Sequence, residues 1–207
     1  MFGNLLKKIN NFADKTVSGV KQIVTQDAFC GTEFSFGGTT IQPTKQIAQG
    51  SFAFVYETNN PEFVIKRMIV QQKSQLAEAL DEIHYQSQLN HCPNICKVFA
   101  CFLSSQMISM DTKLSDLKQV SYPVDFSIII ERCESSALSV LNKCKGFLPE
   151  KDILELFAGA VAGFTAQHNL QIINRDGKIE NMLLKHAANP FHAENVRICD
   201  FGSCTQK

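Results

Sequence analysis

The spacing of apolar and polar residues in the first part of the chain is typical of β-structure. Between Phe34 and Tyr56, short strand-like stretches are interrupted by glycine, and Gly37-Gly38 predicts a turn. Asn59-Asn60-Pro61 predicts a second turn. Residues 53–58 and 62–68 on either side of it therefore form a predicted hairpin.

The pattern becomes more helical in the later part. A helix is predicted over residues 74–90, and strands are predicted over 98–103 and 126–132 on either side of a polar loop. Two short extended pieces are expected at 181–184 and 196–199. Between Glu134 and these pieces the period is helical, with one long apolar face at Ile153, Leu156, Phe157, Ala160, Val161 and Phe164. Strands first and helices afterwards predict an α+β fold in two lobes.

The N-terminal residues 1–27 have a period of their own. Apolar residues recur three or four positions apart from Phe2 to Val24, and most of the lysines lie off this stripe. The pattern predicts an amphipathic helix. Three surfaces are compatible with such a helix: a membrane surface, a partner protein, or the chain's own domain.

Composition narrows the class of protein only a little. A chain of 207 residues suffices for one ordinary domain or a modest bilobal one, and 44% hydrophobic residues is normal for a globular protein. No apolar stretch has the length of a membrane span. The 20 basic and 20 acidic residues cancel, so charge gives no indication of a nucleic-acid partner.

Eight cysteines are scattered along the chain, and no secretory signal precedes them. We interpret them as reduced thiols of a cytoplasmic protein. His91, Cys92, Cys96 and Cys101 could suggest a metal cluster, but their spacing matches no paired zinc site. Core and loop positions are the simpler interpretation.

The first candidate for chemistry is the stretch from Ile47 to Val55. A turn of small residues between two strands, here Gly50 and Ser51, lets backbone N–H groups approach phosphate oxygens closely. One glycine is little support, and a plain hairpin would have a similar sequence. A second candidate is Lys66 in the next strand, which Glu82 on the following helix could hold against nucleotide phosphates. A surface lysine on an edge strand is the alternative.

The third candidate decides between these alternatives. Residues 174–181 contain D-x-K-x-x-N, and Asp200-Phe201-Gly202 follows after two short predicted strands. Asp176 would accept a hydrogen bond from a substrate hydroxyl, and Lys178 would reach the transferred phosphoryl group. Asn181 and Asp200 would supply oxygen ligands to Mg²⁺. The position of Lys178 favours Ser/Thr over Tyr substrates.

The four motifs in this order resemble those of eukaryotic-type Ser/Thr protein kinases. Finer features resemble the Numb-associated family, which contains the adaptor-associated, cyclin-G-associated and yeast actin-patch kinases. These features are Ala48 and Ala53 in the glycine loop, the lead-in strand 36–41, Lys66-Arg67-Met68, and the serine after Asp200-Phe201-Gly202. The resemblance covers about residues 34–207.

The resemblance implies ATP and Mg²⁺ as cofactors and protein substrates with endocytic or actin-related roles. It also implies an adenine site. Ile130 would be the gatekeeper, the backbone of Glu131 and Cys133 would hydrogen-bond the adenine edge, and Val55, Val64 and Leu183 would sandwich the ring. The cytoplasmic location would include membrane-surface contact if residues 1–27 dock there.

The resemblance divides the chain into an N-terminal segment 1–33, a small lobe 34–133 and a partial large lobe 134–207 with the catalytic loop. Because the sequence stops at Lys207, before an activation segment, we expect an incomplete large lobe, an uncovered apolar patch and low turnover by residues 1–207 alone. A pseudokinase-like nucleotide-binding or regulatory module without turnover is the alternative.

Two residues depart from the kinase pattern. Asn174 stands where most kinases have histidine, and Gln86 stands where an apolar side chain normally packs with Val98 and Phe201. A buried amide loses apolar packing and requires hydrogen-bond partners. We therefore expect these positions to affect the stability of the active arrangement.

Overall fold

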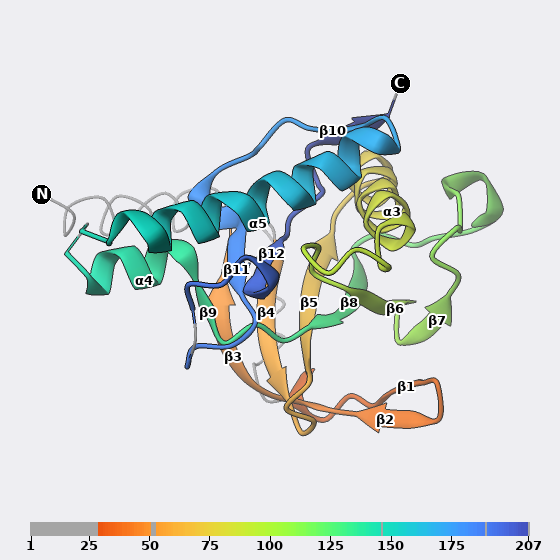
Figure 1. Ribbon diagram of the computed structural model, residues 1–207. Coiled ribbons are helices and arrows are strands. Elements are labelled where there is room, and N and C mark those ends of the chain that lie inside the picture. Colours follow the sequence, from red (N-terminus) through yellow and green to blue (C-terminus); the bar gives the residue numbers. More distant parts are fainter. Residues whose placement is uncertain (1–28, 51–52, 146, 189, 207) are drawn as a thin grey trace, which may run out of the picture.

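The computed structural model describes residues 29–50, 53–145, 147–188 and 190–206 (Figure 1). The predicted amphipathic segment 1–27 and Ser51 of the glycine loop lie outside the described residues, so both remain predictions. The described chain is a mixed α+β structure, which confirms the predicted fold class.

A six-stranded antiparallel sheet forms the first part of the described chain. Its strand order is β3-β4-β5-β8-β6-β7. The strands are β3 (Pro43–Gln49), β4 (Ala53–Thr58), β5 (Phe63–Val70), β6 (Val98–Leu103), β7 (Gln106–Ile108) and β8 (Val124–Glu131). The predicted hairpin is β4–β5. The predicted polar loop between β6 and β8 also contains the short strand β7 and a 3₁₀ turn, η1 (Leu114–Asp116).

Both faces of this sheet are covered. Helix α3 (Lys73–Gln88) packs on one face through Leu76, Leu80 and Ile83, and contacts Ile128 of β8. The next residue, Ile129, points to the opposite face, as strand geometry requires. There it joins aromatic residues around the hairpin of β1 (Phe34–Phe36) and β2 (Thr39–Ile41). The predicted turn Gly37-Gly38 closes this hairpin with positive φ at both glycines.

The second part of the described chain contains two helices and short strands. The helices are α4 (Ala137–Lys143) and α5 (Glu150–Asn169). Strands β9 (Ser135–Ser136), β11 (Met182–Leu184) and β12 (Val196–Ile198) pair in the order β12-β11-β9, and β10 (Ile172–Asn174) pairs with β13 (Cys204–Gln206). The 3₁₀ turns η2 (Ile179–Asn181) and η3 (Ala193–Asn195) precede β11 and β12. The sequence predicted β11 and β12, but not the pairs that include β9, β10 and β13.

Helix α5 approaches β12 closely because two of its residues are glycines. A Cβ added to Gly159 would lie 2.4 Å from the carbonyl oxygen of Ala193 and 2.7 Å from the Cβ of Val196. A Cβ added to Gly163 would lie 2.9 Å from the carbonyl oxygen of Asn94. This contact supports the loop between β11 and β12, and so the residues that flank it.

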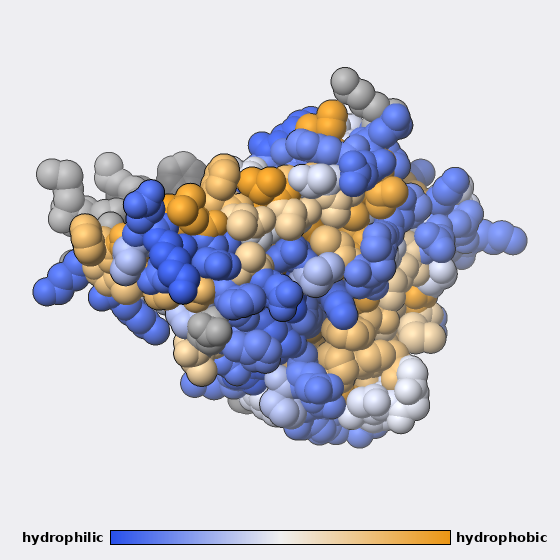
Figure 2. All heavy atoms as spheres, in the orientation of Figure 1, coloured by the Kyte–Doolittle hydropathy of each residue, from blue (hydrophilic) through white to orange (hydrophobic). Residues whose placement is uncertain are grey.

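The predicted apolar face of α5 is divided between core and surface. Leu156, Ala160 and Phe164 pack in the core with β11 and β12. Four neighbours on the helix are 45% to 66% exposed: Ile153, Leu154, Phe157 and Val161. Figure 2 shows apolar side chains along the edge where α5 lies. Among the described residues, no helix is long and apolar enough to cross a membrane.

The glycine contact gives a stability prediction. Gly159→Ala should lower the free energy of unfolding by about 2 kcal/mol, because the added methyl meets backbone rather than a flexible side-chain end. Thermal unfolding should show a Tm lower by roughly 4–8 °C. Ala162→Ser, at an exposed position of the same helix, is the control and should change Tm little. A Gly159→Ala protein as stable as the parent would contradict the close packing of α5 on β12.

Candidate active site

An ion pair between β5 and α3 lies at one side of the candidate site. Lys66 Nζ is 2.5 Å from Glu82 Oε1 and 3.9 Å from Asp200 Oδ1. The side chains of Lys66 and Glu82 are only 20% and 7% exposed. β5 is an interior strand between β4 and β8, so Lys66 is not a surface lysine on an edge strand.

The charge state of Lys66 follows from its neighbours. Burial disfavours the charged amine, but the carboxylates of Glu82 and Asp200 outweigh this effect and raise the pKa of Lys66 above its usual value. The amine is therefore a fixed positive charge at neutral pH. A lysine held in this way can bind phosphate oxygens.

The loop after β10 brings Asp176, Lys178 and Asn181 together. The carboxamide oxygen of Asn174 accepts a hydrogen bond from the backbone N–H of Asp176 at 2.8 Å, which closes a local turn. Lys178 Nζ lies 2.6 Å from Asp176 Oδ2. Asn181 Nδ2 donates to the carbonyl oxygen of Asp176 at 2.9 Å and to its Oδ2 at 3.1 Å.

Asp176 is held as a carboxylate by these contacts. Its hydrogen bond with Lys178, and then that with Asn181, lower the pKa of Asp176. The same pair raises the pKa of Lys178, with the Asp176 hydrogen bond as the main cause. Asp176 is therefore an acceptor at neutral pH, which suits a group that orients a hydroxyl.

The pairing of β11 with β12 brings Asn181 opposite Cys199, the residue before Asp200. Met182 faces Ile198, and the backbone N–H of Cys199 donates to the carbonyl oxygen of Asn181 at 3.0 Å. Asp200 has a positive φ of 64°, an uncommon conformation for a residue other than glycine and one often found at functional sites. Its side chain is half-exposed and reaches toward Lys66.

The donor set at this position fits a hard cation. Asn181 uses its amide nitrogen on Asp176, which leaves its oxygen as the remaining ligand atom. Asp200 adds a carboxylate. Oxygen ligands of this kind are those that Mg²⁺ prefers.

The adenine-site residues predicted by resemblance lie on the expected strands. Val55 faces Lys66 across β4–β5, Val64 faces Ile130 across β5–β8, and Leu183 lies on β11. Ile47 lies near the exposed end of β3, and Gly50, also exposed, follows directly after it. These positions are compatible with the predicted site, and the contacts with adenine remain a prediction.

Residues 131–133, which begin at the last residue of β8, form the predicted hinge that would hydrogen-bond adenine. Existing hydrogen bonds limit which of their backbone groups can bind a ligand. The N–H of Glu131 donates to the carbonyl oxygen of Lys97 at 2.8 Å, so a ligand can be bound only by its C=O, which also accepts from the Cys96 thiol at 3.7 Å. Within the part of the chain that the structure describes, the N–H of Cys133 takes part in no backbone hydrogen bond. Cys133 is therefore the hinge donor that remains.

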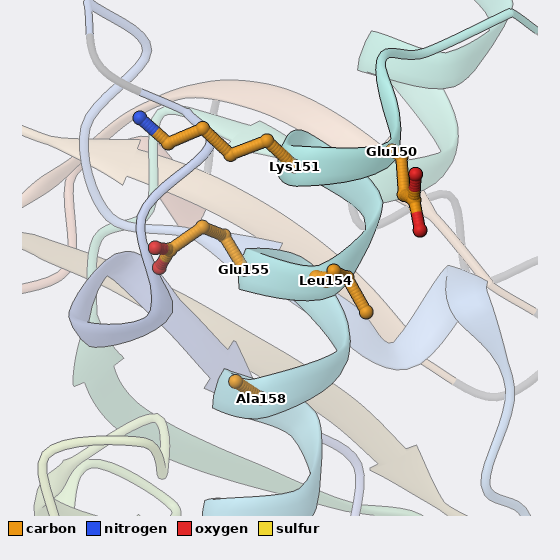
Figure 3. Close-up of a pocket in the computed structure, with 5 residues that line it drawn as sticks. All are labelled: Glu150, Lys151, Leu154, Glu155 and Ala158. Carbon is orange, nitrogen blue, oxygen red and sulfur yellow. The ribbon is translucent and has the colours of Figure 1, made fainter.

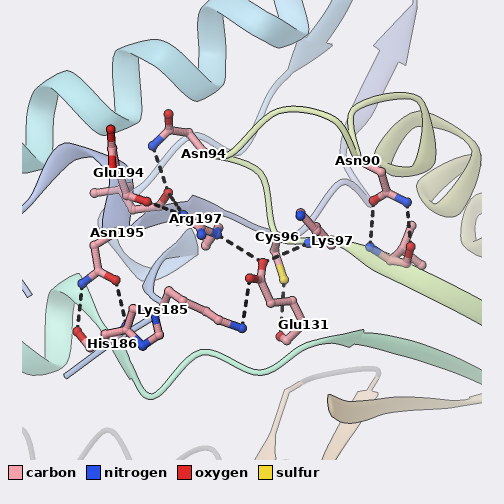
Figure 4. A network of polar contacts seen from close by, with 12 residues as sticks. Asn90, Asn94, Cys96, Lys97, Glu131, Lys185, His186, Glu194, Asn195 and Arg197 are labelled. Carbon is pink, nitrogen blue, oxygen red and sulfur yellow. Dashed lines mark hydrogen bonds and ion pairs between the residues drawn. The ribbon is translucent and has the colours of Figure 1, made fainter. Parts of the chain in front are cut away.

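The side chain of Glu131 has a role that the sequence did not indicate. It is buried, and it accepts contacts from Lys185 Nζ at 3.0 Å and Arg197 Nε at 3.2 Å (Figure 4). The backbone N–H of Lys97 approaches the same carboxylate at 3.4 Å. These contacts join the hinge after β8 to β11, β12 and the start of β6. Only the fold reveals such pairing, because Arg197 lies 66 residues from Glu131.

Gln86 and Asn174, the two residues that depart from the kinase pattern, both make hydrogen bonds through their side-chain amides. Gln86 is buried, and its Nε2 donates to the carbonyl oxygen of Cys96 at 2.6 Å. The expected requirement for a hydrogen-bond partner is thus met. Asn174 uses its oxygen to hold Asp176, whereas its Nδ2 is buried and has no partner among the described residues.

An open hollow on α5 is separate from these groups. It is lined by Glu150, Lys151, Leu154, Glu155 and Ala158 (Figure 3). Lys151 and Glu155 point to the same side of the helix, and Glu155 accepts a hydrogen bond from the backbone N–H of Ala193. None of the residues of the candidate site lines it.

Comparison with known families agrees with the geometry. The model of the protein kinase domain matches residues 41–207. The chain belongs to the protein kinase family. This kinase chain is 29% identical over 185 residues to a probable serine/threonine-protein kinase of Dictyostelium discoideum. The matched region covers 86% of this chain and 21% of the relative.

Two actin-regulating kinases of Saccharomyces cerevisiae are also similar. Each is 28% identical over 186 residues, or 84% of this chain, and the match spans 21% and 26% of their lengths. Their presence among the relatives confirms the predicted resemblance to the group that includes the yeast actin-patch kinases. The chain spans about a fifth to a quarter of the length of the relatives named here.

The loop geometry predicts a change in the titration of Asp176. Removing the ammonium group in Lys178→Met should raise the pKa of Asp176 toward its ordinary value, because the main cause of the lowered pKa is lost. NMR titration of ¹³C-labelled aspartate carboxyls measures this directly. Lys45→Met, at an exposed position of β3, is the control. An unchanged Asp176 titration in Lys178→Met would mean that the two side chains are not paired in solution.

Proposed function

We propose that this kinase domain transfers the γ-phosphoryl group of ATP to Ser or Thr hydroxyls of protein substrates. The observation that supports it most is the arrangement of Lys66, Glu82 and Asp200 beside the loop of Asp176, Lys178 and Asn181. In the kinase pattern these are the groups that position phosphates, metal and hydroxyl.

In this proposal Lys66 and Lys178 bind the phosphate groups of ATP, and Asp176 positions the hydroxyl group of the substrate. Lys66, oriented by Glu82, binds the α- and β-phosphates of ATP. Asp176 accepts a hydrogen bond from the substrate hydroxyl and takes its proton as the oxygen attacks the γ-phosphorus. The bond from the γ-phosphorus to the β,γ-bridging oxygen breaks, and ADP leaves. Lys178 neutralises charge that develops on the transferred group. Catalysis is then chiefly positioning and charge neutralisation.

Asn181 and Asp200 would hold Mg²⁺, which when bound neutralises charge on the phosphate oxygens. Adenine would lie between Val55, Val64 and Leu183, with Ile130 behind it. The C=O of Glu131 and the N–H of Cys133 would contact its edge. In this proposal, the nucleotide would lie between a small lobe at 34–133 and the large-lobe part at 134–207.

The substrate class follows by analogy with relatives. The yeast relatives are named actin-regulating kinases. We propose that the substrates here are proteins of the actin or endocytic machinery, encountered in the cytoplasm. Contact of residues 1–27 with a membrane surface or a partner would bring the domain to them.

Turnover tests the proposed function. Protein expressed from the complete natural gene should phosphorylate a mixture of Ser- and Thr-containing peptides with Mg·ATP, measured by transfer of labelled phosphate. Asp176→Asn should reduce the rate by roughly 10²–10⁴-fold, because the group that orients and deprotonates the hydroxyl is lost. Asp111→Asn, an exposed aspartate paired only with His84 among the described residues, is the control.

Two results would contradict the proposal. Phosphoryl transfer that is unchanged in Asp176→Asn would remove Asp176 from the reaction. Binding of Mg·ATP without transfer to any peptide would instead favour the nucleotide-binding or regulatory module.

A further inference from the structure

Two cysteine thiols lie close together at the proposed hinge, which includes Cys133. The Sγ atoms of Cys96 and Cys133 and a carboxylate oxygen of Glu131 all lie within 4.8 Å of one another. Cys96 comes just before β6 and Cys133 just after β8, and these strands pair. The paired strands therefore bring the two cysteines close together, although they are 37 positions apart in the sequence.

The surroundings of Glu131, the third residue of this cluster, favour thiol chemistry over metal binding. The Glu131 carboxylate already contacts Lys185 and Arg197, and both cations are mostly buried (Figure 4). A metal ion at the same carboxylate would be repelled by these two positive charges. Without Glu131, two sulfur atoms remain, too few for the four-ligand site that structural zinc requires.

The two thiols differ in accessibility. Cys96 is fully buried, whereas Cys133 is partly exposed. A hydrogen bond with Cys133, followed by burial, raises the pKa of Cys96 well above its usual value, so Cys96 keeps its proton. Cys133 is therefore the sulfur that a small oxidant from solvent can reach.

We propose that Cys96 and Cys133 are a redox-sensitive pair whose disulfide weakens nucleotide binding. The oxidant is a hydroperoxide. The sulfur of Cys133 attacks a peroxide oxygen, the O–O bond breaks, and a sulfenic acid and water form. The sulfur of Cys96 then attacks the sulfenic sulfur, the S–O bond breaks, and the Cys96 proton leaves with the second water. Two thiols and one H₂O₂ thus give one disulfide and two waters.

Formation of the Cys96–Cys133 disulfide would displace the hinge backbone at Cys133. Cys96 is held firmly: its N–H donates to the carbonyl oxygen of Ile198 at 2.9 Å, and its C=O accepts from Gln86 Nε2 at 2.6 Å. A disulfide requires an S–S distance of about 2.05 Å. Cys133 lies in an irregular segment between β8 and β9, so it must move toward Cys96. The effect on nucleotide rests on the proposed function, in which Cys133 is the hinge donor.

The test separates bond formation from nucleotide binding. Wild-type protein is reduced or treated with H₂O₂ and mapped by mass spectrometry of peptides without reduction. Affinity for a fluorescent ATP analogue with Mg²⁺ is then measured. We expect a Cys96–Cys133 disulfide and at least a tenfold weaker affinity after oxidation, both reversed by dithiothreitol.

Two variants locate the effect. Cys96→Ser should bind the analogue like the reduced wild type and should lose the peroxide effect. Cys101→Ser is the matched control, because Cys101 is a buried residue of β6 whose thiol, among the described residues, hydrogen-bonds to the carbonyl oxygens of Ile108 and Ser109. It should respond to peroxide as the wild type does.

Four outcomes would overturn the inference. They are absence of the disulfide in peroxide-treated wild type, affinity unchanged when the disulfide has formed, a peroxide effect that persists in Cys96→Ser, and one equivalent of zinc in the purified protein that Cys96→Ser lacks. The last would assign the group to metal binding. Failure of the reduced wild type to bind the analogue would instead contradict the proposed function, while the peptide map would still test the thiol pair.

Discussion

The ion pair between Lys66 and Glu82 is the interaction on which the rest of the site depends. Taking two charges out of water has a substantial free-energy cost, and a mostly buried pair of this kind persists only when the surrounding structure holds both partners. The sheet holds Lys66 between β4 and β8. Helix α3 holds Glu82, and its apolar side packs on the same sheet. Asp200 can then approach Lys66 from the other part of the chain.

Polar contacts at the end of α3 and at the hinge fix this geometry. Asn90 exchanges two hydrogen bonds with the backbone of Val98, and Gln86 donates to Cys96. Gln86, which stands where kinases normally have an apolar side chain, thus tethers α3 to the segment before β6. Glu131 makes a second connection, through Lys185 and Arg197, to the β11–β12 pair, which lies between Asn181 and Asp200 in the sequence. Gln86 and Glu131 are buried, hydrogen-bonded groups, for which loss of one partner is costly.

The sequence predicted those features that depend on local pattern. The β4–β5 hairpin, β6 and α3 follow from turn residues and periodicity, and the D-x-K-x-x-N loop follows from spacing. It did not predict β9, β10 or β13, because these short strands are recognised only through their pairing with residues far along the chain. For the same reason it missed the side-chain role of Glu131 and the proximity of Cys96 to Cys133. The adenine contacts and Ser51 remain predictions.

A double-mutant cycle on Lys66 and Glu82 tests the central claim most directly. Affinity for Mg·ATP is measured by calorimetry for wild type, Lys66→Met, Glu82→Gln and the double variant. If Glu82 acts through Lys66, Glu82→Gln should weaken binding about tenfold in the wild type, or about 1.4 kcal/mol, and hardly at all when Lys66 is already methionine. An equal loss in both backgrounds would show that the two residues act independently and would contradict the account.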